Sequence, residues 1–228
     1  KPTLFKIMIY PNLCVDGFFN NPEEIIDFAN TLDYSPCGYA PGIRTNHLHE
    51  INYGFFQNLC DKQLKLLFPD NPNNLIYEAR SMFQKIPPNY KYTDWIHGDE
   101  PVQFTSIIYL TKNCDAGTNI YKRNFLSQKV NTDIKYEYFK QMTNNKLPKT
   151  KMNELIKSYE EHFKNFEKTI TYKGIYNRLI GFDAYSFHGS EEYYSKQSDD
   201  RLTLITFFDK INSPDLKLKY PVTESRRF

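Results

Sequence analysis

The chain has 228 residues, of which 40% are hydrophobic and 25% are charged, values that are ordinary for a globular domain with one sizeable core. A formal net charge of +2 gives no strong field for nucleic acid or an anionic membrane, and no run of 18 apolar residues predicts a transmembrane helix. The first residues lack the apolar stretch of a signal peptide, and the four cysteines form no C-x-x-C pair, so we expect reduced thiols in a cytoplasmic protein.

The N-terminal part is predicted to contain two short strands and a helix. The segments KIMIY and CVDGFF are typical of strands, and Pro11-Asn12 separates them. The helix begins at Pro22, with Asn21 as its N-cap and acidic residues in its first turn. Its apolar face comprises Ile25, Ile26, Phe28, Ala29 and Leu32.

A loop and a second helix are predicted next. The Pro-Gly pair in YAPGIRT, residues 39–45, indicates a loop. From about His47 to Phe68 the apolar residues fit one long amphipathic helix. A helical support for the fold is therefore expected at about residues 20–70.

The clearest helical pattern is KMNELIKSYEEHFKNFEKTI, residues 151–170. Apolar residues recur there at spacings of three and four, namely Met152, Leu155, Ile156, Tyr159, Phe163 and Phe166. Strands are predicted at 74–86, 102–111, 174–183 and 201–209, which are short and rich in aromatic or β-branched residues. Strands flank helices without strict alternation, which predicts an α+β protein with an antiparallel β core.

The segment WIHGDEP, residues 95–101, holds a candidate pair of metal ligands, His97 and Asp99. On an extended segment, side chains two residues apart share a face and lie about 6.6 Å apart, so both can reach one ion. Gly98 leaves room between them, and Glu100 is expected to point away from the ion. A polar turn is the alternative interpretation, because H-x-D triplets also occur by chance.

The remaining histidines supply a third ligand. His162 lies in the clearest helix and is expected on its surface or partly packed. His47 and His49 fall at a helix start, where residues two apart do not face each other, so a structural role is favoured. His188 ends the apolar stretch NRLIGFDAYSFH, and with His97 and Asp99 it completes two imidazoles and one carboxylate, the facial triad of non-haem Fe(II) oxygenases.

Arg201 and Thr203 open the strand RLTLITFF and share one of its faces. A guanidinium backed by a hydroxyl suits recognition of a carboxylate through paired donors. A salt bridge from Arg201 to Asp199 or Asp200 is the alternative.

Together these residues resemble the 2-oxoglutarate/Fe(II)-dependent dioxygenase superfamily. The resemblance is carried over residues 95–209 by H-x-D, the strand end Tyr109-Leu110, the turn Gly117-Thr118, the distal His188, and R-x-T at Arg201 and Thr203. The layout is similar to the prolyl-4-hydroxylase-like branch, and VDGFFNNPEEIIDFANTLDY followed by YAPGIRT resembles a bacterial and phage family of that superfamily. The resemblance implies a single domain over residues 1–228, with a double-stranded β-helix (jelly-roll) core at about 74–209 and flanking helices.

The resemblance also implies a site. His97, Asp99 and His188 would hold Fe(II), and Arg201, Thr203 and Tyr109 would bind the cosubstrate 2-oxoglutarate, although Tyr109 fits a core role equally well. Dioxygen would then oxidise 2-oxoglutarate to succinate and CO2 while a C–H bond of a peptide, amino acid or small molecule is hydroxylated.

Several points stay open at this stage. Trp95 would line the substrate entrance or pack in the core, the segment from about 119 to 171 carries no assignable motif, and the oligomeric state is not indicated. A cupin-like binding module without turnover and a zinc hydrolase with the same triad are the alternatives. Neither requires a carboxylate clamp such as Arg201.

Overall fold

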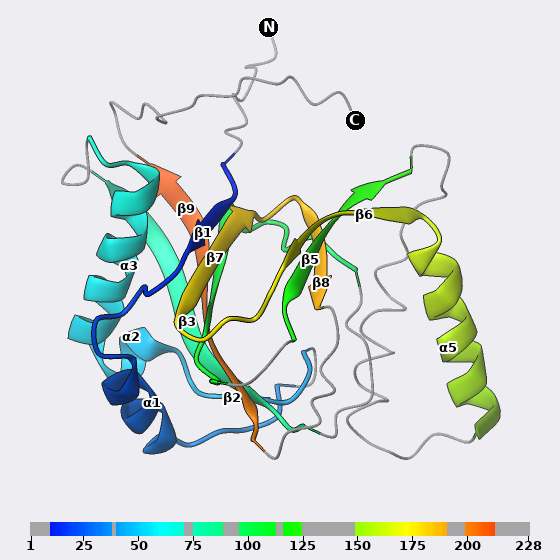
Figure 1. Ribbon diagram of the computed structural model, residues 1–228, viewed down its shortest axis with the longest axis horizontal. Coiled ribbons are helices and arrows are strands. Elements are labelled where there is room, and N and C mark those ends of the chain that lie inside the picture. Colours follow the sequence, from blue (N-terminus) through cyan, green and yellow to red (C-terminus); the bar gives the residue numbers. More distant parts are fainter. Residues whose placement is uncertain are drawn as a thin grey trace, which may run out of the picture.

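Two antiparallel sheets form the centre of the molecule (Figure 1). The computed structural model describes residues 10–37, 40–70, 75–88, 96–112, 116–124, 149–190 and 199–212. Six strands pair in the order β1-β7-β4-β9-β3-β2, and three pair in the order β6-β5-β8. The strands are β1 (Leu13–Val15), β2 (Ile43–Arg44), β3 (Ile76–Ile86), β4 (Phe104–Tyr109), β5 (Thr118–Arg123), β6 (Phe166–Tyr172), β7 (Arg178–Asp183), β8 (Phe187–Ser190) and β9 (Arg201–Asn212).

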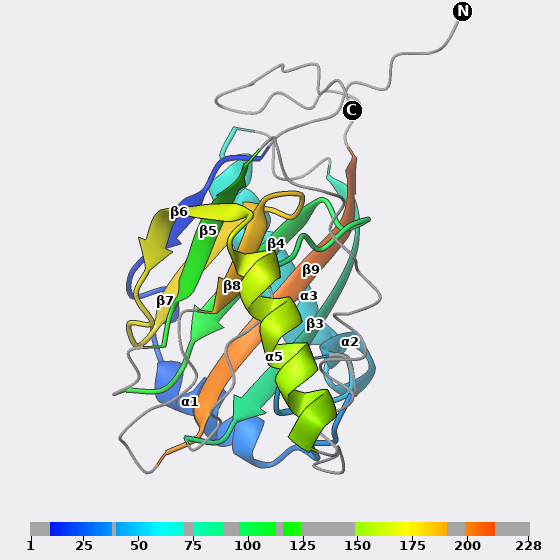
Figure 2. The ribbon, with the colours of Figure 1, turned by 90° about the vertical axis from the view of Figure 1, so that its right-hand side faces the viewer.

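The helices lie on two sides of these sheets. They are α1 (Pro22–Asn30), α2 (Leu48–Ile51), α3 (Tyr53–Leu67) and α5 (Lys149–Phe163). Figure 1 shows α1, α2 and α3 beside the large sheet and α5 beyond the small sheet, and Figure 2 shows α5 in front of the small sheet. The chain is therefore α+β with mostly antiparallel strands, as predicted. Among the described residues, no helix has the length and apolar character needed to cross a membrane.

Both faces of the large sheet carry buried residues. Along each strand successive side chains point to opposite faces, so each residue can be assigned to one face. Phe83, Leu204 and Ile108 are cross-strand partners on β3, β9 and β4, and their face joins the main core with residues of α3. The next row along, Gln84, Thr203 and Tyr109, is on the opposite face.

The opposite face of the large sheet packs partly against the small sheet. Ile120 of β5 forms a buried cluster with Tyr109, Ile180 and Phe182, which come from β4 and β7. Beside this cluster the inner face carries polar residues, and they mark the site described below.

The prediction of one continuous helix at 47–68 was wrong, because the structure has two helices there, α2 and α3. The helical segment breaks at Asn52, which has a non-helical backbone (φ −150°, ψ 89°) and whose side chain accepts a hydrogen bond from Phe55 N at 3.0 Å. This Asn caps α3 because its side chain competes with the helical backbone bonds, so α2 ends after one turn. The predicted start at Pro22 is confirmed, although the Asn21 side chain donates to Glu24 and caps no backbone group.

The predicted helix at 151–170 was wrong at its C-terminal end. α5 ends at Phe163, and Phe166–Tyr172 form β6, which pairs with β5. Phe166 packs with Ile96 and Tyr121 rather than on a helix face. In the segment FEKTITY, alternate residues face one side, and this alternation competes with the helical spacing.

The four predicted strands are present as β3, β4, β7 and β9, with shorter bounds for β4 and β7. The loop predicted at 39–45 contains β2, and β5 and β8 were not predicted. CVDGFF is a strand only to Val15, because the chain turns at Gly17 with φ of 65°. All of KIMIY except Tyr10 lies outside the described residues.

Candidate metal centre

The structure brings His97 and His188 together through the backbone. The two residues form an antiparallel β-bridge, with His97 N donating to His188 O at 2.9 Å and His188 N donating to His97 O at 2.8 Å. Directly bridged residues present their side chains on the same face, and the two imidazole centroids are 4.4 Å apart. The extended segment expected at His97 is thus confirmed, with a partner strand that the sequence alone did not identify.

Asp99 lies between the two imidazoles. Its Oδ1 is 3.4 Å from His97 Nε2 and its Oδ2 is 3.3 Å from His188 Nε2. The three residues offer ligand atoms that all lie within 4.8 Å of one another. Two imidazoles and one carboxylate are a donor set suited to Fe(II) and related divalent metals.

Each ligand is oriented by a second contact. Thr105 on β4 donates its hydroxyl to Asp99 Oδ2 at 2.8 Å. His188 Nδ1 is 2.9 Å from the carbonyl oxygen of Ser186, and since a carbonyl only accepts, Nδ1 carries the proton. Nε2 of His188 faces Asp99, and it is the ring nitrogen that could bind a metal.

A tight turn after β7 fixes both Asp99 and His188. Asp99 N donates to the carbonyl of Ala184 at 2.8 Å, in the same turn as Ser186. The carboxylate of Asp183 accepts from Tyr185 N at 2.9 Å and from Tyr10 N at 3.1 Å, so Asp183 anchors this turn.

The carboxyl group of Asp99 is ionised. Burial raises its pKa, but the charge and hydrogen bonds of His188, with a further contribution from His97, hold the pKa well below its usual value. A half-buried carboxylate beside two imidazoles is stabilised by a cation placed among them.

Arg201 and Thr203 line the same cavity as the triad, which has a volume of about 260 Å³. Arg201 is buried, donates from Nε to the carbonyl of Ala116 at 3.1 Å, and lies over the ring of Tyr109 at 5.3 Å. The Thr203 hydroxyl is fully buried and has no hydrogen-bond partner among the described residues. A buried guanidinium beside an unsatisfied hydroxyl suits a bound carboxylate, which accepts hydrogen bonds from both.

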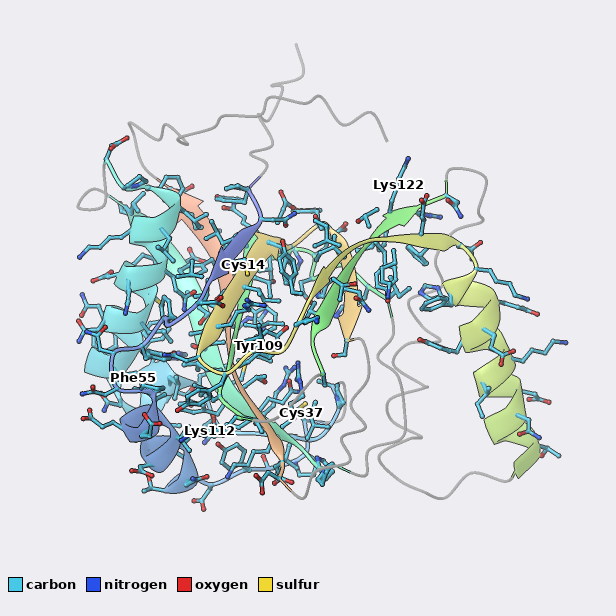
Figure 3. All side chains as sticks on the ribbon, in the orientation of Figure 1. Cys14, Cys37, Phe55, Tyr109, Lys112 and Lys122 are labelled. Atoms are coloured by element: carbon cyan, nitrogen blue, oxygen red, sulfur yellow. The ribbon has the colours of Figure 1, made fainter. Side chains whose placement is uncertain are left out.

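Tyr109 lies between the two sheets (Figure 3). Its hydroxyl is 2.8 Å from that of Thr118, and Thr118 lines the cavity whereas Tyr109 does not. A direct contact from Tyr109 to the cosubstrate stays a prediction. The turn before Thr118 requires glycine, since a Cβ at Gly117 would overlap the carbonyl oxygen of Tyr172.

The other histidines differ from expectation. His162, expected on the helix surface or partly packed, is buried, and its Nε2 lies 2.9 Å from the carbonyl oxygen of Ile96, next to His97. The expectation that His47 and His49 do not face each other was wrong, because His47 is extended (φ −67°, ψ 136°) and precedes α2. Their rings stack with centroids 5.4 Å apart.

Sequence reasoning missed the supporting residues Thr105 and Asp183, whose contacts follow no local pattern.

Glu100 is exposed and lines the cavity as well. Trp95 and Cys114 lie outside the described residues, as does residue 39 of the predicted loop. Of the segment from 119 to 171, residues 125–148 also lie outside them.

Several solved structures share the fold. HygX from Streptomyces hygroscopicus, solved with nickel and 2-oxoglutarate bound, is 11% identical with a TM-score of 0.53 over 93% of this chain and 86% of that chain. SnoN, a non-heme alpha ketoglutarate dependent epimerase from nogalamycin biosynthesis, is 11% identical with a TM-score of 0.51 over 95% of this chain and 92% of that chain. A Pseudomonas putida prolyl-4-hydroxylase is 11% identical with a TM-score of 0.48 over 87% and 92%.

The fold of this chain is thus that of HygX and SnoN. No curated protein has a significant sequence match to the chain. A family model does match, and it covers residues 8–208. The chain therefore belongs to the family of unknown function DUF6445.

Proposed function

We propose that this protein is an Fe(II)- and 2-oxoglutarate-dependent dioxygenase that hydroxylates an unactivated C–H bond of an amino acid, peptide or other small molecule. One observation carries the proposal: the triad His97, Asp99 and His188 and the pair Arg201 and Thr203 line a single cavity. HygX has 2-oxoglutarate and a metal bound in a structure of the same fold, which supports this interpretation. The core is then a double-stranded β-helix, with the site between its two sheets.

In this proposal His97, Asp99 and His188 would hold Fe(II), which would supply the activation of dioxygen needed to convert 2-oxoglutarate to succinate and CO2. The residues of the chain prepare the site. Ser186 holds the Nδ1 proton of His188, and Thr105 orients the Asp99 carboxylate.

The far carboxylate of 2-oxoglutarate binds to Arg201 and Thr203. Burial of the Arg201 guanidinium strengthens this pairing, because charge-assisted hydrogen bonds gain strength where water is excluded. Ile205 and Phe207, which line the cavity from β9, keep its wall apolar. A cupin-like module or a zinc hydrolase uses neither the guanidinium nor the hydroxyl at this position.

Succinate formation tests the proposal. The purified protein with Fe(II), ascorbate and 2-oxoglutarate is expected to form succinate slowly without prime substrate, as measured by mass spectrometry. Asp99→Ala should abolish metal binding and turnover, whereas Arg201→Ala should mainly raise the KM for 2-oxoglutarate by more than about tenfold. The proposal is wrong if the wild-type protein neither binds 2-oxoglutarate nor forms succinate.

A further inference from the structure

The peptide group that joins Ile96 to His97 is hydrogen bonded at both ends. Its N–H belongs to His97 and donates to the carbonyl oxygen of His188 at 2.9 Å. Its carbonyl oxygen belongs to Ile96 and lies 2.9 Å from Nε2 of His162, and since a carbonyl only accepts, that Nε2 carries the proton. The N–H and C=O of a trans peptide group point in opposite directions, so His188 and His162 hold this group from opposite sides.

The orientation of this peptide group determines where the His97 imidazole lies. A peptide group is planar and its plane includes the Cα atom of the next residue, so a tilt of the Ile96–His97 plane also turns the Cα–Cβ bond of His97. Nε2 of His97 lies 3.4 Å from Oδ1 of Asp99. A functional group must be held to within about 0.5 Å of its productive position, so a small tilt is enough to displace this ligand.

Both partners of the bond between His162 and Ile96 are shielded from water. Ile96 is fully buried, and His162 is only 6% exposed. Ile96 packs in a cluster with Tyr121 and Phe166, and the His162 ring lies 4.9 Å from the ring of Phe166. Removal of the donor at His162 would therefore leave a buried carbonyl oxygen without its partner, and the peptide group would be free to tilt.

His162 is itself tied to the small sheet. It lies in the last turn of α5, and α5 is followed directly by β6. Asn165 N donates to His162 O at 3.1 Å, and Asn124 N donates to Asn165 O at 2.8 Å, which joins the end of α5 to the end of β5. β5 also pairs with β8, the strand of His188. The two groups that hold the peptide therefore belong to one unit, the small sheet with the helix in front of it (Figure 2).

We propose that His162 is a positioning residue of the metal centre, which holds the His97 imidazole in place for the ion through the carbonyl group of Ile96. This inference rests on the metal site of the proposed function, and it assigns a role to α5. A ligand that is already held in the metal-free protein loses less conformational freedom when the ion binds, so the affinity is higher. By linkage, the bound ion strengthens the contact between α5 and Ile96 by the same factor.

Calorimetry with Ni(II) on the metal-free protein tests the inference in two variants of His162. His162→Leu keeps a similar volume and removes the donor, whereas His162→Gln keeps an N–H donor near the position of Nε2. His162→Leu is expected to weaken Ni(II) binding by about tenfold, since loss of a group that orients a metal ligand typically costs 10- to 100-fold. His162→Gln is expected to stay within about threefold of the wild type. Wild-type affinity in His162→Leu, or equal losses in both variants, overturns the proposal.

Phe166→Leu is the matched control, because it disturbs the same cluster and removes no hydrogen bond. Thermal melts of the metal-free proteins establish that all three variants fold, and both leucine variants are expected to have a lower Tm than the wild type. Only His162→Leu is expected to lower the affinity for Ni(II) and to change the visible absorption spectrum of bound Co(II), which depends on the ligand geometry. An equal loss of affinity in Phe166→Leu would show that packing alone places His97, and it would overturn the proposal.

Ni(II) and 2-oxoglutarate together separate the two proposals. If the wild-type protein binds both and forms succinate while His162→Leu keeps the wild-type affinity for Ni(II), the dioxygenase function stands and the role of His162 fails. If the wild-type protein binds Ni(II) but not 2-oxoglutarate, and His162→Leu weakens Ni(II) binding, the role of His162 stands and the dioxygenase function fails.

Discussion

The Thr203 hydroxyl is buried without a hydrogen-bond partner among the described residues, an arrangement that costs free energy of folding unless a ligand satisfies it. Thr203→Val removes the hydroxyl and keeps the shape of the side chain. We expect the free energy of unfolding without ligand to stay equal or rise by up to about 1 kcal/mol. The KM for 2-oxoglutarate should rise by about tenfold, since a hydrogen bond to a charged group contributes about 1.5–3 kcal/mol. Urea unfolding and succinate formation measure the two effects.

Thr206→Val is the matched control on the same strand. The Thr206 hydroxyl accepts a hydrogen bond from Gln63 Nε2 at 3.1 Å and is 3.0 Å from the hydroxyl of Ser81, on the face of the sheet that packs against α3. Its loss leaves buried partners unsatisfied and should lower the free energy of unfolding by about 1–3 kcal/mol, with an unchanged KM for 2-oxoglutarate. If Thr203→Val destabilised the protein as much as Thr206→Val does, the Thr203 hydroxyl would have a structural partner instead.

The cysteines are predicted to differ in reactivity. Burial, with a smaller effect of the Asp61 charge, raises the pKa of Cys60 to about 12, so the thiol is almost fully protonated at pH 8 and is also inaccessible. Cys14 lies exposed on β1 (Figure 3). Iodoacetamide at pH 8 should label Cys14 and spare Cys60 in the native protein, as measured by peptide mass spectrometry. Labelling in urea is the control, and equal rates for the two cysteines in the native protein would contradict the burial of Cys60.

The turn that follows β7 positions two of the proposed metal ligands. Its carbonyl groups hold Asp99 and His188, and the Asp183 carboxylate holds the turn. Asp183→Asn replaces one acceptor oxygen with a donor, so either Tyr10 N or Tyr185 N loses its bond. Disturbing residues that orient metal ligands typically costs 10- to 100-fold in metal affinity, and we expect a loss of about this size for Ni(II), measured by calorimetry.

Asp209→Asn is the control for Asp183→Asn. Asp209 is also an aspartate of the large sheet, but it pairs with the half-exposed Arg80. Among the described residues, no hydrogen bond joins the Asp209 side chain to the turn after β7. Its replacement should leave the affinity for Ni(II) unchanged. Equal losses in the two variants would show that charge alone, and not the anchoring of the turn, sets the affinity.

Some elements were predictable because their signals are local. Pro22 and the acidic first turn determine where α1 begins, and aromatic or β-branched residues mark β3 and β9. Asn52 is also a typical helix-cap residue, but the apolar periodicity on both sides of it favoured the prediction of one continuous helix. Phe166 lies three residues after Phe163 and also alternates with later residues, so only its pairing with Arg123 on β5 decides for a strand.

The site was predictable to the extent that its residues have distinctive chemistry. His97, Asp99, His188, Arg201 and Thr203 were selected by residue type and spacing, and the structure places all five around one cavity. Thr105 and Asp183 were not selected, because each acts through partners that are brought near only by the folded chain. Strands β5 and β8 were not predicted for the same reason, since each is short and pairs with a strand that is distant in the chain.

The proposed metal centre lies where the two sheets meet. His188 belongs to β8 of the small sheet, whereas Asp99 is bonded to Thr105 on β4 of the large sheet. An ion bound by His188 and Asp99 therefore links the two sheets directly, and its binding free energy adds to the stability of the fold because the unfolded chain has no such site.

Metal is consequently expected to stabilise the whole domain. Ni(II) at about 100 times its Kd contributes about 2.7 kcal/mol, which corresponds to a rise in Tm of about 5–10 °C for a chain of this size. Asp99→Ala should remove this rise, because it deletes the ligand that lies between the imidazoles, whereas Arg80→Gln should retain it. Differential scanning calorimetry with Ni(II) and with excess chelator measures the shift. A rise of equal size in Asp99→Ala would place the ion elsewhere, and the second group of possible ligands, His47, His49 and Glu50, would then be the next to replace.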